Sequence, residues 1–107
     1  MAPLLQGNRI DHWIGGARVA PANGEYLESI DPSVGSAWIE VPGGDARDVD
    51  AAVAAAKAAF EGPWRMMAAM QRAALLRAVA VRIAEHAEEL ATIECRDNGK
   101  PIREAIP

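Results

Sequence analysis

The single cysteine of the chain, Cys95, and its two histidines are the side chains whose chemistry would be most specific. A cysteine thiolate can act as a nucleophile, but it needs a nearby general base or positive charge. The sequence around Cys95 holds neither a Cys-x-x-Cys nor a Cys-His pattern. His12 and His86 could serve as bases or metal ligands, yet neither has a partner at the spacing of a metal site. We therefore expect an inert structural cysteine and imidazoles that are exposed or locally hydrogen-bonded.

Two glycine pairs, Gly15-Gly16 and Gly43-Gly44, would suit phosphate-binding loops. Neither fits the G-x-G-x-x-G or the Walker pattern, so turns are the favoured interpretation. Isolated tryptophans could stack on a ligand but usually pack, and the glutamates have the spacing of a solvated helix face rather than of an acid-base pair. These residues are Trp13, Trp38 and Trp64, and Glu85, Glu88, Glu89 and Glu94. The residues alone therefore predict no catalytic constellation.

The composition excludes several function classes. The chain has 107 residues and a net charge of −4, so it lacks the basic excess of a nucleic-acid-binding surface. No apolar run approaches the roughly 20 residues of a membrane span, since the alanine-rich stretch 51–60 is interrupted by Lys57. The first ten residues lack the basic start and apolar core of a signal peptide. A single cysteine fits a reducing compartment, and the cytoplasm is expected.

The hydrophobic half of the composition predicts only a thin core. Alanine accounts for 23 residues, whereas leucine, isoleucine, valine and phenylalanine together number 22. Alanine favours helices but buries few methylene groups. We therefore do not expect the chain to be tightly self-sufficient.

Period-2 alternation and turn residues predict strands in the first part of the chain. Residues 10–14 and 17–19 flank Gly15-Gly16, a pair that favours a two-residue hairpin turn. A third strand over residues 26–30 ends at Asp31-Pro32, and a fourth follows over residues 37–41.

Helical spacing begins after Gly43-Gly44. Asp45 is a suitable N-cap for a helix that ends at Gly62-Pro63, with one narrow apolar stripe. A second helical stretch over residues 68–96 is expected to kink or break at His86. Residues 98–101 form a helix stop, and a further element starts near Arg103. The stripe of the first helix consists of Val49, Val53, Ala56 and Phe60.

Several short motifs follow one another in order along the chain. They are His12–Gly16, Ser29–Pro32, Asp48–Val53, Ala58–Phe60 with Pro63-Trp64, Arg72, Leu75–Arg77, and Asp97–Pro101. Each motif is weak alone, but their joint order and spacing are specific. From about His12 to Glu104, the chain resembles the N-terminal region of the aldehyde dehydrogenase superfamily.

The resemblance implies an enzyme that oxidises aldehydes to carboxylic acids with NAD or NADP, using a cysteine nucleophile, a glutamate base and an asparagine in the oxyanion site. In that family these groups and the cofactor-binding sheet lie beyond the matched region. Cys95 therefore does not correspond to the catalytic cysteine. We predict an N-terminal fragment without catalytic or cofactor-binding residues, inactive alone, whose complete enzyme acts on an aldehyde and is a homo-oligomer.

The predicted fold class is an α+β fragment. A β-hairpin and further strands precede two or three amphipathic helices, corresponding to the N-terminal part of the α/β aldehyde dehydrogenase fold. Residues 1–44 form a strand and turn segment, and residues 45–107 form a helical segment. Together they make one incomplete domain that packs on the cofactor-binding domain in the remainder of the subunit. The narrow apolar stripe fits this expectation, because it requires a partner surface.

The resemblance also implies a cation site. Some family members bind a structural monovalent cation, K⁺ or Na⁺, at positions that match Ser29, Ile30 and Asp97, with a further ligand from beyond residue 107. Carbonyl and carboxylate oxygens are suitable ligands for a hard cation. The alternative is that Asp97 only bonds the local backbone at its helix end.

A second function remains open at this point. The chain could be a small free-standing interaction or regulatory module that docks on another protein. A reading frame that continues past the codon for Pro107 would favour the fragment, and a sharp cooperative melting transition of a monomer would favour the module.

Overall fold

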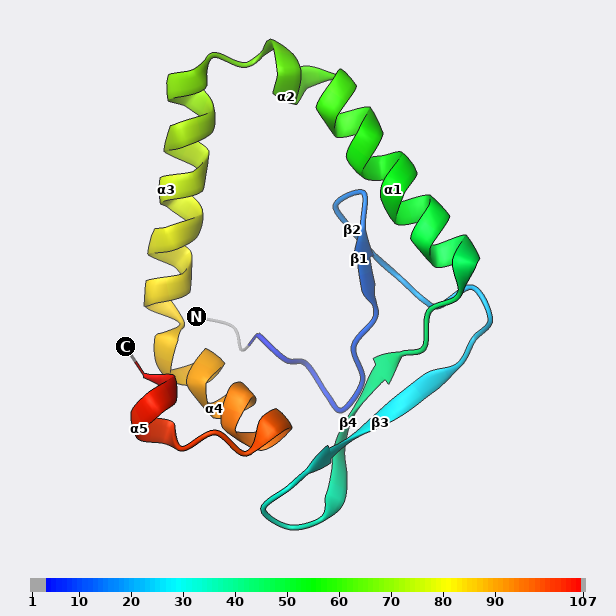
Figure 1. Ribbon diagram of the computed structural model, residues 1–107, viewed down its shortest axis with the longest axis vertical. Coiled ribbons are helices and arrows are strands. Elements are labelled where there is room, and N and C mark those ends of the chain that lie inside the picture. Colours follow the sequence, from blue (N-terminus) through cyan, green and yellow to red (C-terminus); the bar gives the residue numbers. More distant parts are fainter. Residues whose placement is uncertain (1–3, 107) are drawn as a thin grey trace. The chain divides into compact units, whose positions relative to one another are not determined.

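The structure is a computed structural model that describes residues 4–106. Strands come first along the chain and helices follow, as predicted (Figure 1). Strand β1 (His12–Ile14) pairs antiparallel with β2 (Ala17–Val19), and Trp13 lies opposite Arg18. Gly15 and Gly16 both have positive φ angles, 62° and 80°, which a two-residue hairpin turn of this type requires. The predicted hairpin is confirmed.

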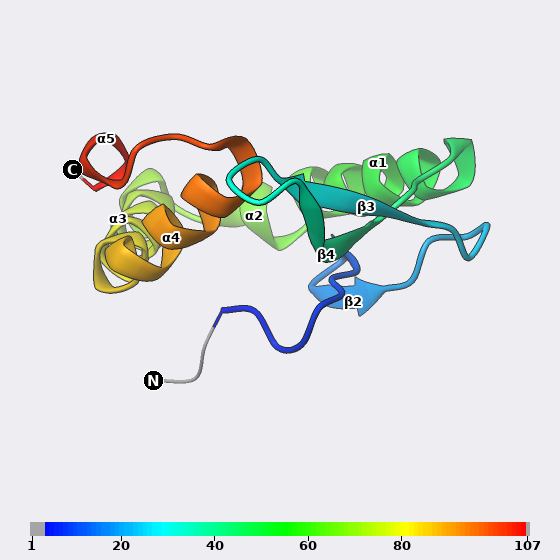
Figure 2. The same ribbon diagram turned by 90° about the horizontal axis from the view of Figure 1, so that it is seen from below.

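The second sheet consists of β3 (Tyr26–Asp31) and β4 (Ser36–Pro42), which twist around each other (Figure 1 and Figure 2). Asp31 organises the turn between them, because its carbonyl accepts the N–H of Gly35 at 2.8 Å. The segment before β1 pairs with β4. The Ile10 N–H donates to the Glu40 carbonyl, and the Glu40 N–H donates to the Asn8 carbonyl. Both predicted strands of this sheet are therefore confirmed.

Helix α1 (Ala46–Glu61) starts at a capping box. The Asp45 side chain accepts the N–H of Arg47, and the Asp48 side chain accepts the N–H of Asp45 at 2.9 Å. The helix ends before Gly62, as predicted. Pro63 then starts α2 (Pro63–Met66), a single turn that the sequence did not predict. A proline with its fixed φ and missing N–H suits the first helical position as well as it ends a helix.

The predicted break in the second helical stretch is confirmed. Helix α3 (Ala69–Glu85) and α4 (Ala87–Asn98) are separated by His86, which lies outside both. Gly99 closes α4 in the left-handed conformation at φ 78°, and its N–H donates to the Cys95 carbonyl. Helix α5 (Ile102–Ala105) follows. Residues 4–106 thus contain five helices; α2 and α5 are single turns, and α1, α3 and α4 are the longer helices that the predicted fold class includes.

The chain forms two compact units that interleave in sequence. Unit 1 contains residues 4–10, 27–41 and 79–106, and unit 2 contains residues 11–26 and 42–78. Among the described residues, the buried apolar ones are Ile39 and Ala91 in unit 1 and Pro21 in unit 2. The predicted thin core is therefore confirmed. No helix within residues 4–106 is both long and apolar enough to cross a membrane.

Candidate functional site

The residues with the most specific chemistry do not assemble into a site. Cys95 is half-buried on α4, and the structure gives it no side-chain partner within residues 4–106. His86 Nδ1 lies 3.3 Å from a Glu89 oxygen in unit 1, whereas His12 lies beside Asp48 in unit 2. No group of three histidine, cysteine or acidic side chains in the described part of the chain could hold a metal ion.

Ser29 and Asp97 are brought together in unit 1 although 68 residues separate them. The Ser29 hydroxyl donates to Asp97 Oδ1 at 2.5 Å, from β3 to the last turn of α4. Ile30 follows Ser29 on the strand, so its side chain points to the opposite face of β3 and is exposed. Two of the three predicted ligand residues thus place side-chain oxygens at one point, while Ile30 can contribute only its backbone carbonyl.

A second set of contacts beside this point joins α4 to β3 and to β4, and we call it the clasp. Asp31 Oδ2 lies 3.5 Å from Arg96 Nε, and the Arg96 guanidinium stacks 4.7 Å from the centre of the Trp38 ring. The separation fits a cation–π contact. Ser33 donates to Asp31 through its backbone N–H and its hydroxyl, at 2.9 Å and 2.6 Å. Ser33 therefore holds one oxygen of the buried Asp31 carboxylate, and Arg96 lies beside the other.

The hydrogen bonds of Asp31 predict an acid-sensitive contribution to stability. The Ser33 hydroxyl and N–H, assisted by Arg96, lower the pKa of Asp31 below its ordinary value of 3.8. Because the folded pKa is the lower one, Asp31 stabilises the fold above pH 3.8, and this contribution is lost as the pH falls through the lowered pKa. We expect Asp31→Asn to flatten the acid limb of a plot of melting temperature against pH.

Asp50→Asn is the control for this titration, since the Asp50 carboxylate accepts no hydrogen bond within residues 4–106. Thermal melting followed by circular dichroism between about pH 6 and about pH 2 covers the range in which aspartates titrate. An Asp31→Asn variant whose acid limb ran parallel to that of the wild type would contradict the expectation.

The glycine pairs do not form a nucleotide-binding loop. Gly15-Gly16 make the hairpin turn, and Gly43-Gly44 precede α1. A phosphate would need the free N–H groups at the start of α1, but the carboxylates of Asp45 and Asp48 already accept from this region and would repel it. The start of α1 therefore does not suit a phosphate group.

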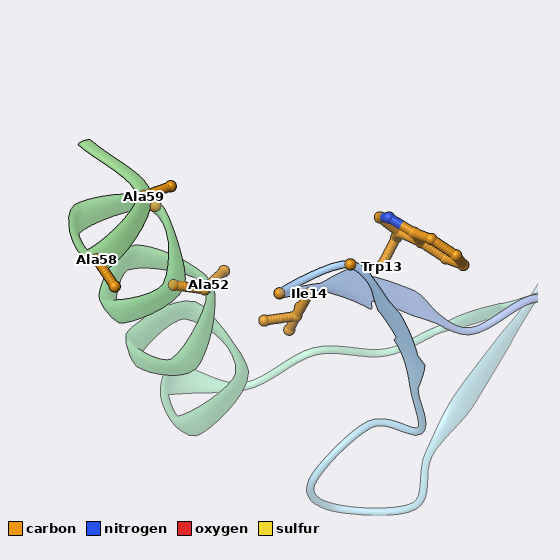
Figure 3. A pocket seen from close by; sticks show the side chains of 9 residues that line it. Trp13, Ile14, Ala52, Ala58 and Ala59 are labelled. Carbon is orange, nitrogen blue, oxygen red and sulfur yellow. The ribbon is translucent and has the colours of Figure 1, made fainter. Parts of the chain in front are cut away.

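A pocket of about 580 Å³ lies between the hairpin and α1 in unit 2. Figure 3 shows Ile14 directed toward α1, whereas the Trp13 ring points away from the helix and is 70% exposed. The residues that line the pocket carry no charge and no reactive group. They are Trp13, Ile14, Gly15, Gly16, Ala52, Ala55, Ala56, Ala58 and Ala59. Such a lining suits packing rather than catalysis.

Comparison with known proteins establishes the family. A profile described as "Aldehyde dehydrogenase family" matches residues 19–106, which is most of the chain. The chain belongs to the aldehyde dehydrogenase family. A probable aldehyde dehydrogenase of Mycobacterium tuberculosis is 46% identical over 99 residues, covering 92% of this chain and 19% of that protein. The fluoroacetaldehyde dehydrogenase of Streptantibioticus cattleyicolor is 46% identical over 98 residues, with the same coverage.

The solved structures agree with this assignment. An aldehyde dehydrogenase from Bacillus cereus, determined as an NAD⁺ complex, superposes with a TM-score of 0.89 at 40% identity. The match covers 92% of this chain and 20% of that one. The chain thus spans about a fifth of the length of the aldehyde dehydrogenases that it matches.

Sequence reasoning missed the polar residues that organise this aldehyde dehydrogenase chain. Asp31 was interpreted only as part of a strand stop, and Arg96 as the end of a helical stretch. Asp48 was noted only as the first residue of the Asp48–Val53 motif, but it accepts the N–H of Ala22 at 3.0 Å and lies 3.8 Å from His12 Nε2. Within the sequence, only the family resemblance linked Ser29 with the distant Asp97.

Proposed function

We propose that the chain is the N-terminal region of an NAD(P)-dependent aldehyde dehydrogenase, an enzyme that oxidises an aldehyde to a carboxylate. The family match over residues 19–106 carries this proposal. The region supplies support rather than chemistry. It forms one incomplete domain that packs on the cofactor-binding part of the subunit, and the active groups and the NAD or NADP site belong to that remainder.

The exposed apolar residues support a packing role. On α1, Val49, Val53 and Phe60 are 60%, 60% and 65% exposed, while Ala55 faces the hairpin 3.9 Å from the Cβ position of Gly15. Helix α3 has no buried residue among those described, although it carries five large aliphatic side chains. Burying one such side chain contributes about 1.5 to 3 kcal/mol to stability. Covering these faces with the rest of the subunit would therefore stabilise the fold more than most surface interactions do. The five are Leu75, Leu76, Val79, Val81 and Ile83.

An activity assay tests the proposed division of labour. The purified 107-residue chain, supplied with NAD⁺ or NADP⁺ and a panel of aldehydes, is expected to give no reduced cofactor, because it lacks an activated nucleophile. A complete aldehyde dehydrogenase is the positive control. Turnover by the chain that disappears in Cys95→Ala would overturn the predicted inactivity and identify Cys95 as the nucleophile.

Biophysical measurements separate this proposal from a free-standing module. Exposed apolar faces predict binding of a hydrophobic dye, self-association and a broad melting transition for the chain alone. A monomer that melts sharply and binds no dye would favour the module. We propose that the complete enzyme is a cytoplasmic homo-oligomer. It acts on a small-molecule aldehyde and binds neither nucleic acid nor membrane.

We also propose a monovalent cation site, for K⁺ or Na⁺, at Ser29, Ile30 and Asp97. The contact of the Ser29 hydroxyl with the Asp97 carboxylate supports it, because it gathers oxygen ligands from two distant segments. The Ile30 carbonyl would be a third oxygen, and a ligand from beyond residue 107 would complete the set. Asp97 lies in the last turn of α4, where the helix dipole disfavours an anion and favours a cation.

A further inference from the structure

We propose that Arg96 is a positioning residue for this cation site, which it serves by holding Asp97 opposite Ser29. The inference rests on the cation site proposed above and concerns residues that the family resemblance does not assign. Arg96 does not touch Ser29 or Asp97 in the contacts that the structure gives; it acts through the clasp.

The alternation of β3 puts the two attachment points on one face. Ser29 and Asp31 are two residues apart on the strand, so both side chains point to the same side. That side meets the end of α4, where Asp97 contacts Ser29 and Arg96 contacts Asp31. Two neighbouring helix residues are thus joined to two same-face strand residues. This arrangement fixes both the position of the helix end along β3 and its rotation.

The clasp also determines where the charge of Arg96 goes. Its guanidinium is shared between the buried Asp31 carboxylate and the face of Trp38. The structure gives Asp97 no ion pair within residues 4–106, and the only side-chain bond it receives there is from the uncharged Ser29 hydroxyl. The Asp97 carboxylate therefore keeps its negative charge available for a cation. An arginine without its two partners would compete for that carboxylate.

A third contact limits how the helix end can move. A Cβ added to Gly99 would lie 2.9 Å from Pro32 Cγ, so the backbone after α4 passes close to the residue that follows Asp31. Together with Arg96, this contact brackets Asp97 on both sides in sequence. A cation at Asp97 would therefore meet a carboxylate that is already oriented.

Cation titrations of the complete subunit test the proposal, because the site needs a ligand from beyond residue 107. Melting temperatures are measured in increasing KCl or NaCl against choline chloride at equal ionic strength. For the wild type we expect a stabilisation specific to the small cation, which Asp97→Asn abolishes. Arg96→Ala is expected to raise the cation concentration at half-maximal stabilisation at least about tenfold, beyond any drop in the melting temperature in choline chloride. A purely structural role would lower that baseline and leave the half-maximal concentration unchanged.

Matched variants make the outcomes distinguishable. Arg96→Lys keeps the charge without the planar stacking and should restore part of the affinity. Arg103→Ala, which removes an exposed arginine near the same end of the chain, should change nothing. If Arg96→Ala does not fold, Arg96→Lys and Trp38→Phe carry the comparison, both with intermediate values expected. A wild type without a cation-specific response would overturn the site and the inference together, whereas a normal response in the Arg96 variants would overturn the inference alone.

Discussion

Replacing Gly99 with alanine is expected to lower the free energy of unfolding by about 2 to 4 kcal/mol, from the left-handed backbone and from overpacking. Gly99 has a φ of 78°, a conformation that costs an L-residue energy. Its added Cβ would also lie 2.9 Å from Pro32 Cγ, closer than real side-chain contacts allow. Urea unfolding followed by far-ultraviolet circular dichroism measures the loss.

Gly35→Ala separates the two causes. Gly35 has a similar φ of 72°, but no atom lies within 4 Å of its Cβ position. It should therefore cost only the backbone part, about 1 kcal/mol or slightly more. Adding Pro32→Ala to Gly99→Ala should recover part of the loss. Equal losses for the two glycine variants would show that the contact with Pro32 is not tight.

The second large effect is expected at Asp48. This side chain is 6% exposed and accepts the N–H groups of Ala22 and Asp45, at 3.0 Å and 2.9 Å. Asp48→Ala leaves both donors without a partner, and an unsatisfied buried group costs about 1 to 3 kcal/mol. We expect a loss of about 2 to 4 kcal/mol in urea unfolding, allowing for partial access of water to the two donors.

Two controls test whether the hydrogen bonds at Asp48 are responsible. Asp48→Asn keeps one acceptor oxygen and nearly the same shape, so it should lose about half as much. Asp50→Ala removes a carboxylate from the same turn of α1 and should have a small effect within about 0.5 kcal/mol. If Asp50→Ala were as damaging as Asp48→Ala, the helix dipole rather than the buried bonds would explain both.

Local rules predicted the elements of this chain well. Gly15-Gly16, Asp45 and Gly99 act through backbone conformation and nearby N–H groups, so a few neighbouring residues determine their role. The break at His86 could be predicted for the same reason, because the apolar pattern changes there within one turn. The sequence predicted that Pro63 ends one helix but not that it begins the next, although the same properties of proline suit both positions.

The contacts of the candidate site could not be predicted in this way. Arg96 lies 65 residues from Asp31, and nothing in either neighbourhood indicates that they meet. The family resemblance paired Ser29 with Asp97, but it gave no reason for the geometry. The stacking of Arg96 on Trp38 depends on which face of β4 meets α4, and alternation within the strand leaves that choice open.

The interleaving of the two units limits how this region can be dissected. Unit 1 draws on residues 27–41 and 79–106, and unit 2 draws on residues 11–26 and 42–78, so a cut between residues 44 and 45 leaves neither unit whole. Each unit must close a long loop before its contacts form, at an entropic cost that grows slowly with loop length. Truncation between residues 44 and 45 is therefore expected to remove contacts from both units.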